Sequence, residues 1–176
     1  VTVTTNPPVP GYEQFKLQRG GWIQFAAPGA FLIEADGPVM VGHYLTGSTY
    51  PGSQLACLDE ATGTESAIGD PAFTLAVPVK RFLKKYTVLT PGGYAENYLN
   101  IVIPTGASVT IDGAPLSAPV IPIPGTNFGI ARPSVSPDAI HVVKGTAPIG
   151  LTAYGYDCDV SYAYPGGMKL QAISEN

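Results

Sequence analysis

Few side chains in this chain could do chemistry, and the two histidines come first. His43 lies in the run Val41-Gly42-His43-Tyr44-Leu45, and His141 lies in Ala139-Ile140-His141-Val142-Val143. Each alternates with apolar neighbours, which is typical of a hydrogen-bonded structural histidine or a surface histidine on a strand. A histidine-based hydrolase needs a nucleophile in a strained turn, and the sequence has no GxSxG elbow. It also lacks the nucleotide-binding motifs GxxxxGK[ST] and GxGxxG. We therefore predict that the protein is not an enzyme and holds no cofactor.

The two cysteines, Cys57 and Cys158, are far apart in the sequence and lack the spacing of a zinc site. An even cysteine count in a β-rich chain with few charges predicts a disulfide bond between them. Such a bond would close a long loop and would require an oxidising compartment. Two buried, unpaired thiols are the alternative.

Two acids flank the second cysteine, and they are the candidates for a metal site. Asp157 and Asp159 are two positions apart, so on a strand both would point to the same face. With carbonyl groups near Asp59 and Glu60 they could bind Ca²⁺. The alternative is a pair of solvated carboxylates, and the sequence does not decide between the two.

Tyrosines are the remaining candidates for a binding site. Four of the ten tyrosines lie between Ala153 and Gly167, each next to a small residue or proline, which predicts half-buried strands. Tyr154 and Tyr156 should share one face of a strand, as should Tyr162 and Tyr164. We expect one pair in the core and the other near the Cys57 loop, facing solvent. Tyrosine offers a rigid ring with a polar tip, so the candidate ligand contacts are Tyr50, Tyr154, Tyr156, Tyr162 and Tyr164.

The composition determines which elements must position these residues. The 176 residues include 21 glycines and 18 prolines, yet 45% are hydrophobic and only 12% are charged. Many short strands joined by many turns explain both features. The net charge of −4 gives no indication of binding to nucleic acid or anionic membranes. No apolar run approaches the roughly 20 residues that span a bilayer.

One charge cluster departs from this pattern. Four of the nine basic residues lie in the segment Lys80-Arg81-Phe82-Leu83-Lys84-Lys85. Lysines often protect an exposed strand edge, which is the simplest interpretation. A docking patch for an acidic partner or a glycan is the alternative.

The apolar runs predict an all-β fold, an antiparallel and jelly-roll-like β-sandwich with Gly/Pro-rich turns. Asp36-Gly37 and Asp112-Gly113 are hairpin signals, and residues 46–71 form one long loop without periodicity. We expect one domain over residues 1–176, cut from a larger surface or secreted protein. The predicted strands cover residues 1–5, 12–18, 22–25, 30–35, 39–45, 73–77, 85–90, 98–103, 109–111, 140–143, 149–154 and 160–164, with 169–173 as a short additional strand and 115–125 as an extended edge.

Several segments, in order, resemble the N-terminal domain family of the IgGFc-binding protein. They include Gly20 to Phe25, Phe31 to Tyr44, Tyr86 to Pro91, Tyr98 to Val102, Ile111-Asp112-Gly113, His141 and Tyr154-Gly155-Tyr156. The most specific are Gly69-Asp70-Pro71-Ala72 and Ser161-Tyr162-Ala163-Tyr164-Pro165-Gly166-Gly167. The chain looks like the C-terminal half of that family's domain, whereas residues 46–66 and 115–125 depart from it.

The resemblance implies a secreted or surface module without catalytic residues. We therefore expect a non-enzymatic extracellular domain that binds a protein or glycan at a cell surface or in the matrix. A purely structural module that contacts neighbouring domains, and a carbohydrate-binding module, are the alternatives. Neither nucleic acid nor direct membrane insertion is expected.

Overall fold

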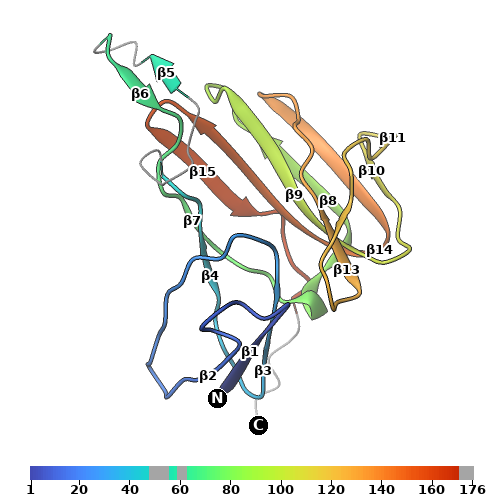
Figure 1. The fold of residues 1–176 in the computed structure, drawn as a ribbon. Helices are drawn as coiled ribbons and strands as arrows, with labels where there is room; N and C mark the ends of the chain where they lie inside the picture. The colour runs from blue at the N-terminus through green and yellow to red at the C-terminus, as the bar shows by residue number, and fades with distance from the viewer. Residues whose placement is uncertain (48–55, 59–62, 171–176) are drawn as a thin grey trace.

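The computed structural model describes residues 1–47, 56–58 and 63–170, and nearly all of its regular secondary structure consists of antiparallel strands. In these residues the only helical element is the 3₁₀ turn η1 (Val79–Arg81). Figure 1 shows a small N-terminal sheet at the bottom, a large curled sheet at the upper right, and a hairpin that projects at the upper left. The predicted all-β antiparallel class is confirmed.

The N-terminal sheet has the order β2-β1-β3, with β1 (Thr2–Asn6) in the centre. Its flanking strands are β2 (Gln14–Lys16) and β3 (Leu32–Ala35). Alternation in β1 buries Val3 and Thr5 and leaves the residues between them half-buried. The predicted strand at 22–25 is wrong: the segment is irregular and Trp22 is 81% exposed.

The curled sheet has eight strands, and β14 is its central strand. One path through it has the order β11-β10-β14-β9-β13-β12, and β8 and β15 each pair with β14 as well. Their bounds are β8 (Leu83–Thr90), β9 (Glu96–Pro104), β10 (Val109–Ile111), β11 (Ala114–Pro115), β12 (Ile121–Pro122), β13 (Phe128–Ala131), β14 (Ala139–Asp157) and β15 (Val160–Pro165).

Strand β14 explains how one sheet forms both layers of a sandwich. Its first half pairs with β8 and β10, and its second half pairs with β9 and β15. The register with β8 shifts between Lys144 and Ile149, so the sequence predicted two separate strands where the chain forms one irregular strand. The two halves of the sheet share a core of Tyr86, Val88, Leu99, Ile101, Ile103, Val109, Ala131, Val143, Ile149, Leu151 and Ala153.

Two small strand pairs lie beside the curled sheet. β4 (Gly42–Tyr44) pairs with β7 (Phe73–Leu75), and β5 (Ala56–Leu58) pairs with β6 (Glu65–Ala67). The region 46–71 is therefore not one loop, because it contains the β5–β6 hairpin. The hairpin predicted at Asp36-Gly37 is also wrong, since β3 pairs with β1 and β4 pairs with β7. The hairpin predicted at Asp112-Gly113 is confirmed as β10–β11.

Candidate functional site

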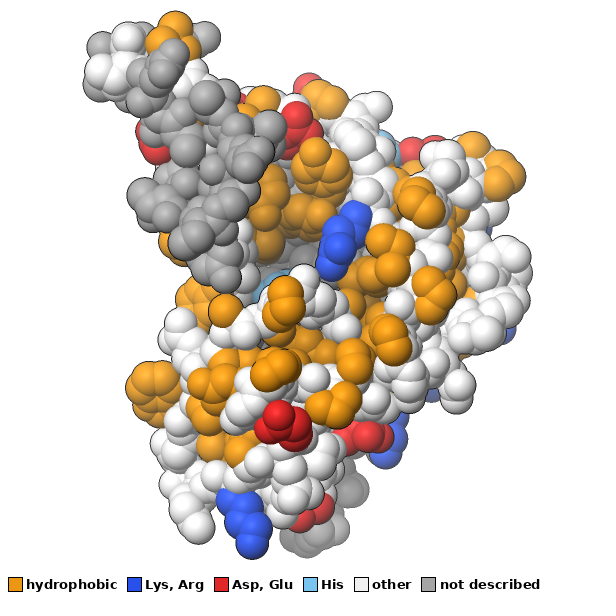
Figure 2. Space-filling view, in the orientation of Figure 1, with side chains coloured by type: hydrophobic (Ala, Val, Ile, Leu, Met, Phe, Trp, Pro, Cys, Tyr) orange, Lys and Arg blue, Asp and Glu red, His pale blue; other side chains and the backbone are white. Residues whose placement is uncertain are grey.

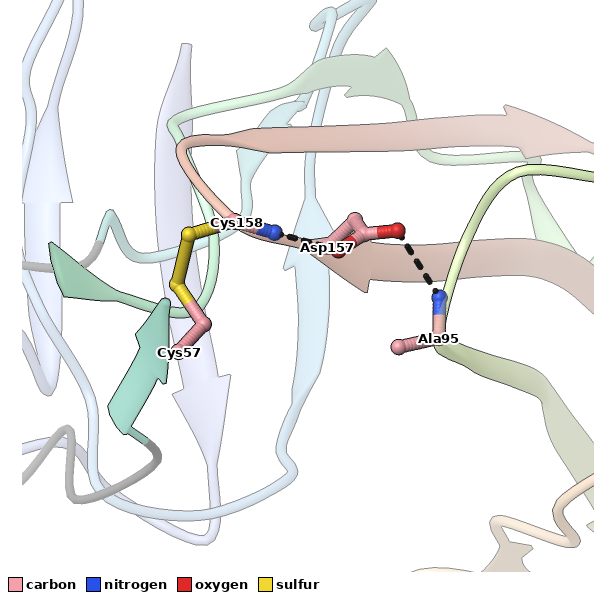
Figure 3. The surroundings of a disulfide bond; sticks show 4 residues. All are labelled: Cys57, Ala95, Asp157 and Cys158. Atoms are coloured by element: carbon pink, nitrogen blue, oxygen red, sulfur yellow. Dashed lines mark hydrogen bonds between the residues drawn. A yellow bond between two sulfur atoms is a disulfide. The ribbon is translucent and has the colours of Figure 1, made fainter. Parts of the chain in front are cut away.

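A disulfide bond connects the small β5–β6 hairpin to the large sheet. Cys57 on β5 is bonded to Cys158, which directly follows β14, with 5.6 Å between their Cα atoms. The disulfide predicted from the cysteine count is therefore present. Figure 3 shows the bond beside Asp157, at the end of β14.

The carboxylate of Asp157 holds the backbone around this bond. It accepts a hydrogen bond of 2.7 Å from the backbone N–H of Cys158 and one of 3.2 Å from that of Ala95 (Figure 3). Asp159 does not share a strand face with Asp157, because it lies in the β14–β15 turn with a φ of 53°. The prediction that both acids point the same way is therefore wrong. Asp59 and Glu60 lie outside the described residues.

The segment after β6 packs against the same end of β14. Ile68 forms a β-bridge with Cys158, and the backbone N–H of Gly69 donates to the carbonyl of Asp157 at 2.9 Å. Gly69 has a φ of +101°, and a Cβ atom there would lie 3.0 Å from the ring of Tyr156. A glycine is therefore required where this segment passes over that ring.

The four C-terminal tyrosines lie on opposite faces of the sheet, in the pairs that parity predicts. Tyr162 is opposite Gly155 in the ladder, and Tyr164 is opposite Ala153. Since Ala153 is fully buried, Tyr162 and Tyr164 face inward and pack against the core. Tyr154 and Tyr156 face the other way. Both pairs are nevertheless half-buried, so neither is fully core nor fully exposed.

The hydroxyl groups of the inward pair bond to the protein. Tyr162 donates to Oδ1 of Asn97 at 2.7 Å, and Asn97 is 2% exposed. The Tyr164 hydroxyl donates to the carbonyl of Leu89 and accepts from the N–H of the same residue at 3.0 Å. Burial raises the pKa of Tyr162 to about 12. These two tyrosines thus have defined structural contacts.

The outward pair belongs to a cluster of three rings that we call the tyrosine face: Tyr98, Tyr154 and Tyr156. Tyr98 on β9 is opposite Tyr154 and stacks on it with 5.4 Å between ring centroids. Tyr154 meets Tyr156 edge to face at 5.8 Å. In the described part of the chain, the hydroxyls of Tyr154 and Tyr156 have no hydrogen-bond partner in the protein, unlike that of Tyr98, which donates to Glu96 at 2.5 Å.

One cation and one histidine lie near the tyrosine face. The exposed Arg132, just after β13, interacts electrostatically with Tyr154, Tyr156 and His43. The pKa of His43 is lowered, first by packing around its ring and then by Arg132, although the residue as a whole is exposed. Its imidazole is therefore neutral at pH 7. Burial raises the pKa of Tyr154 to about 12, and the bond to Glu96 is the main cause of a similar rise to about 12 at Tyr98.

Figure 2 shows one face of the molecule, in the orientation of Figure 1. Hydrophobic side chains spread over much of it, and a hollow separates its upper and lower parts, with a basic side chain and a histidine beside the hollow. Two buried polar atoms in the described residues lack partners, Oγ1 of Thr74 on β7 and Oδ1 of Asn100 on β9. Thr74 is opposite His43, and Asn100 is two residues from Tyr98 on the same face of β9. The arrangement suits contact with a polar, ring-stacking ligand.

The second histidine is part of the framework. His141 is 4% exposed, with Nδ1 at 2.7 Å from a carboxylate oxygen of Asp112 and Nε2 at 3.2 Å from the hydroxyl of Thr90. This acid–histidine–hydroxyl sequence resembles a hydrolase triad in composition only. Thr90 is fully buried and its hydroxyl donates to the carbonyl of Ser136 at 2.6 Å, so no substrate reaches it. His141 is structural, as its apolar neighbours predict.

Sequence reasoning found only part of the tyrosine face. It singled out Tyr154 and Tyr156 but missed Tyr98 on β9, as well as the neighbouring Arg132 just after β13. The alternation of apolar residues along 97–103 could have placed Tyr98 on the outer face of β9, but only the β9–β14 register brings it to Tyr154. Tyr50 lies outside the described residues.

A family model described as IgGFc binding protein matches residues 1–155. The chain belongs to this family. The match ends within β14 and includes Tyr98, Arg132 and Tyr154. Tyr156, Cys158 and the Ser161–Gly167 segment lie beyond its end. The match also includes β1 and β2 of the N-terminal sheet, which precede the segments of the resemblance described above.

Neither the curated proteins nor the solved structures include a match to this chain. Among the residues described, no helix has the length and apolar character needed to cross a membrane. Within that same part of the chain, no three His, Cys, Asp or Glu side chains are grouped as metal ligands.

Proposed function

We propose that this member of the IgGFc-binding protein family is a non-enzymatic, extracellular binding domain whose contact site is the tyrosine face. The observation that carries the proposal is the difference between the two tyrosine pairs. The inward hydroxyls bond to the protein, whereas those of Tyr154 and Tyr156 have no partner among the described residues and can bond to a ligand. Tyrosine rings with free polar tips beside an arginine are the composition of binding hot spots.

The disulfide bond supports the extracellular part of the proposal. Disulfide bonds persist in oxidising compartments, such as the cell exterior and the bacterial periplasm. Adhesion to a protein at a cell surface or in the matrix is the role we favour, and a glycan is the second ligand class. The name of the family makes the Fc region of IgG the first protein to test.

The test is a binding screen that compares the parent chain with a variant that lacks the Tyr156 hydroxyl and the Arg132 charge. The purified chain is screened against IgG Fc, matrix proteins and a glycan array, alongside the double variant Tyr156→Phe/Arg132→Gln. We expect at least one ligand whose binding to the double variant is about tenfold weaker, the effect of about 1.4 kcal/mol. A matched control is Tyr12→Phe, which removes a hydroxyl in the N-terminal sheet region and should leave binding unchanged.

Two outcomes would count against the proposal. One is a ligand that binds the double variant as tightly as the parent chain, which would place the contact site elsewhere. The other is the absence of any ligand in the screen, which would favour the structural module. That second candidate is supported by the exposed apolar face of the β4–β7 pair, where Tyr44, Phe73 and Leu75 are 56%, 52% and 44% exposed.

A further inference from the structure

The basic residues gather at one end of an acidic molecule. Four of the nine occur in η1 and at the start of β8, and two more join them in space. Lys144 is the ladder partner of Lys85, and the backbone N–H of Lys169 donates to the carbonyl of Arg81 at 2.8 Å. We call these six the basic end: Lys80, Arg81, Lys84, Lys85, Lys144 and Lys169.

No acidic side chain neutralises the basic end in the part of the chain that the structure describes, where the one ion pair is His141–Asp112. Lys85 and Lys144 are directly opposite each other on adjacent strands, an arrangement that is destabilising for like charges. All members except the half-buried Arg81 are exposed. This concentration of uncompensated positive charge favours an anionic partner.

Among the residues that the structure describes, strand β8 leads away from the basic end and has a free edge. The N–H and C=O of Leu89 point away from β14, because both bond to the hydroxyl of Tyr164. By the alternation of an antiparallel ladder, those of Thr87 and Lys85 point the same way. At the far end, the N–H of Leu83 is bonded to the hydroxyl of Tyr86 at 2.9 Å. Between these two tyrosine contacts, Lys85 and Thr87 offer backbone groups that a partner strand can pair with.

An apolar groove adjoins this free edge. It has a volume of about 540 Å³ and is lined by Thr87, Val88, Leu89, Pro91, Tyr162 and Tyr164. The outer face of the same strand is apolar at the groove end, where Leu89 is 53% exposed, and basic at the other, where Lys85 lies. The edge thus combines backbone hydrogen-bonding groups, an apolar groove and positive charge along one line.

We propose that the free edge of β8 binds an extended, acidic peptide segment of a partner protein by strand addition. The segment pairs with Lys85 and Thr87, places apolar side chains in the groove and directs Asp or Glu side chains to the basic end. A sulfated glycan would satisfy the charge but would use neither the backbone groups nor the apolar groove, so the peptide fits better. The surface is separate from the tyrosine face, and the proposal does not rest on it.

The experiment selects the peptide rather than assuming its sequence. A phage library of random twelve-residue peptides is panned on the whole chain at low salt, and on the variant Lys84→Glu/Lys85→Glu in parallel. We expect enriched peptides that alternate apolar residues and carry Asp or Glu at one end. A synthetic enriched peptide should bind the variant at least about tenfold more weakly and should lose affinity as salt rises. The matched control, Lys16→Glu/Arg19→Glu, reverses two charges outside the basic end and should change affinity less than about twofold.

Backbone pairing is tested by amide hydrogen exchange with the synthetic peptide bound. The N–H groups of Lys85 and Thr87 should exchange more slowly, whereas that of Leu89, already bonded to Tyr164, should not change. N-methylation of alternate peptide amides should abolish binding. If Lys84→Glu/Lys85→Glu fails to fold, Lys85→Gln replaces it.

Three results would overturn the proposal. The first is no enrichment on the parent chain relative to the variant. The second is unchanged exchange at Lys85 and Thr87 with the peptide bound. The third is that heparin and the N-methylated peptide bind as tightly as the unmodified peptide, which would identify a simple polyanion site.

Discussion

At the scale of single residues, the contacts of the tyrosine hydroxyls predict unequal effects of the same substitution. Tyr162→Phe leaves the buried Oδ1 of Asn97 without its partner, so the free energy of unfolding should fall by about 1–3 kcal/mol. Tyr156→Phe removes a hydroxyl that has no partner in the described part of the chain, so the free energy of unfolding should change by less than about 0.5 kcal/mol. Urea unfolding of both variants checks this. Equal losses would mean that the Tyr156 hydroxyl is also structural.

The same residue predicts how stability changes in alkali. The pKa of Tyr162 is raised from 10.0 to about 12, chiefly by burial. A group with a raised folded pKa stabilises the protein fully below its unfolded pKa, so this contribution should be lost as the pH rises from 10 toward 12. Tyr162→Phe should reduce the loss of stability across that window. Urea unfolding at pH 9 to 11.5 is the measurement, and an unchanged slope in the variant would contradict it.

Asp112 predicts the opposite dependence in acid. Its pKa is lowered from 3.8, first by the hydrogen bond to His141 and then by the bond from the Val142 N–H. A depressed folded pKa means that the stabilisation is present above pH 3.8 and is lost as the pH falls through the folded pKa. The Asp112→Asn variant should thus be less stable than the parent chain at pH 6, and it should lose less stability than the parent chain on acidification to pH 2.5. Asp138→Asn is a matched control, since that residue also has a positive φ, of 49°.

At the scale of elements, one charge reversal should stabilise the pairing of β8 with β14. Lys144→Glu converts the Lys85–Lys144 pair into opposite charges, which should stabilise the sheet by about 0.2–1 kcal/mol. The gain should shrink in high salt because the pair is exposed. Thermal unfolding at low and high salt measures both effects, and a destabilised variant would show that Lys144 has another role.

The elements also show how far sequence reasoning reached. The same Asp-Gly signal was right at 112–113, where both residues have positive φ and adjacent strands pair, and wrong at 36–37, where each strand found a distant partner. Two strands were predicted, at 140–143 and 149–154, but pairing on both sides makes them one strand, β14. Parity placed the tyrosine pairs on opposite faces. It could not say which pair faces inward, because that depends on the strands that cover each face.

At the scale of the whole molecule, the disulfide bond limits the unfolded chain more than it adds contacts. It joins residues 101 positions apart, so the chain-entropy estimate of its stabilisation is roughly 4–5 kcal/mol. The variant Cys57→Ala/Cys158→Ala should lose stability on that scale and unfold with a steeper urea dependence, because its unfolded state is less compact. Retention of parent stability would show that the bond constrains only the β5–β6 hairpin.

The central position of β14 has a consequence for the synthesis of the protein. Among the described strands β8 pairs with β14 alone, and β9 needs β14 to complete its ladder, yet β14 follows both by tens of residues. During translation from the N-terminus, these strands leave the ribosome with unpaired edges and cannot complete their pairing until residues 139–157 have been synthesised. Cys57 cannot form its disulfide bond until Cys158 emerges directly afterwards. Sheet closure and cysteine oxidation are therefore late, nearly simultaneous events, and the nascent chain before them needs protection from aggregation.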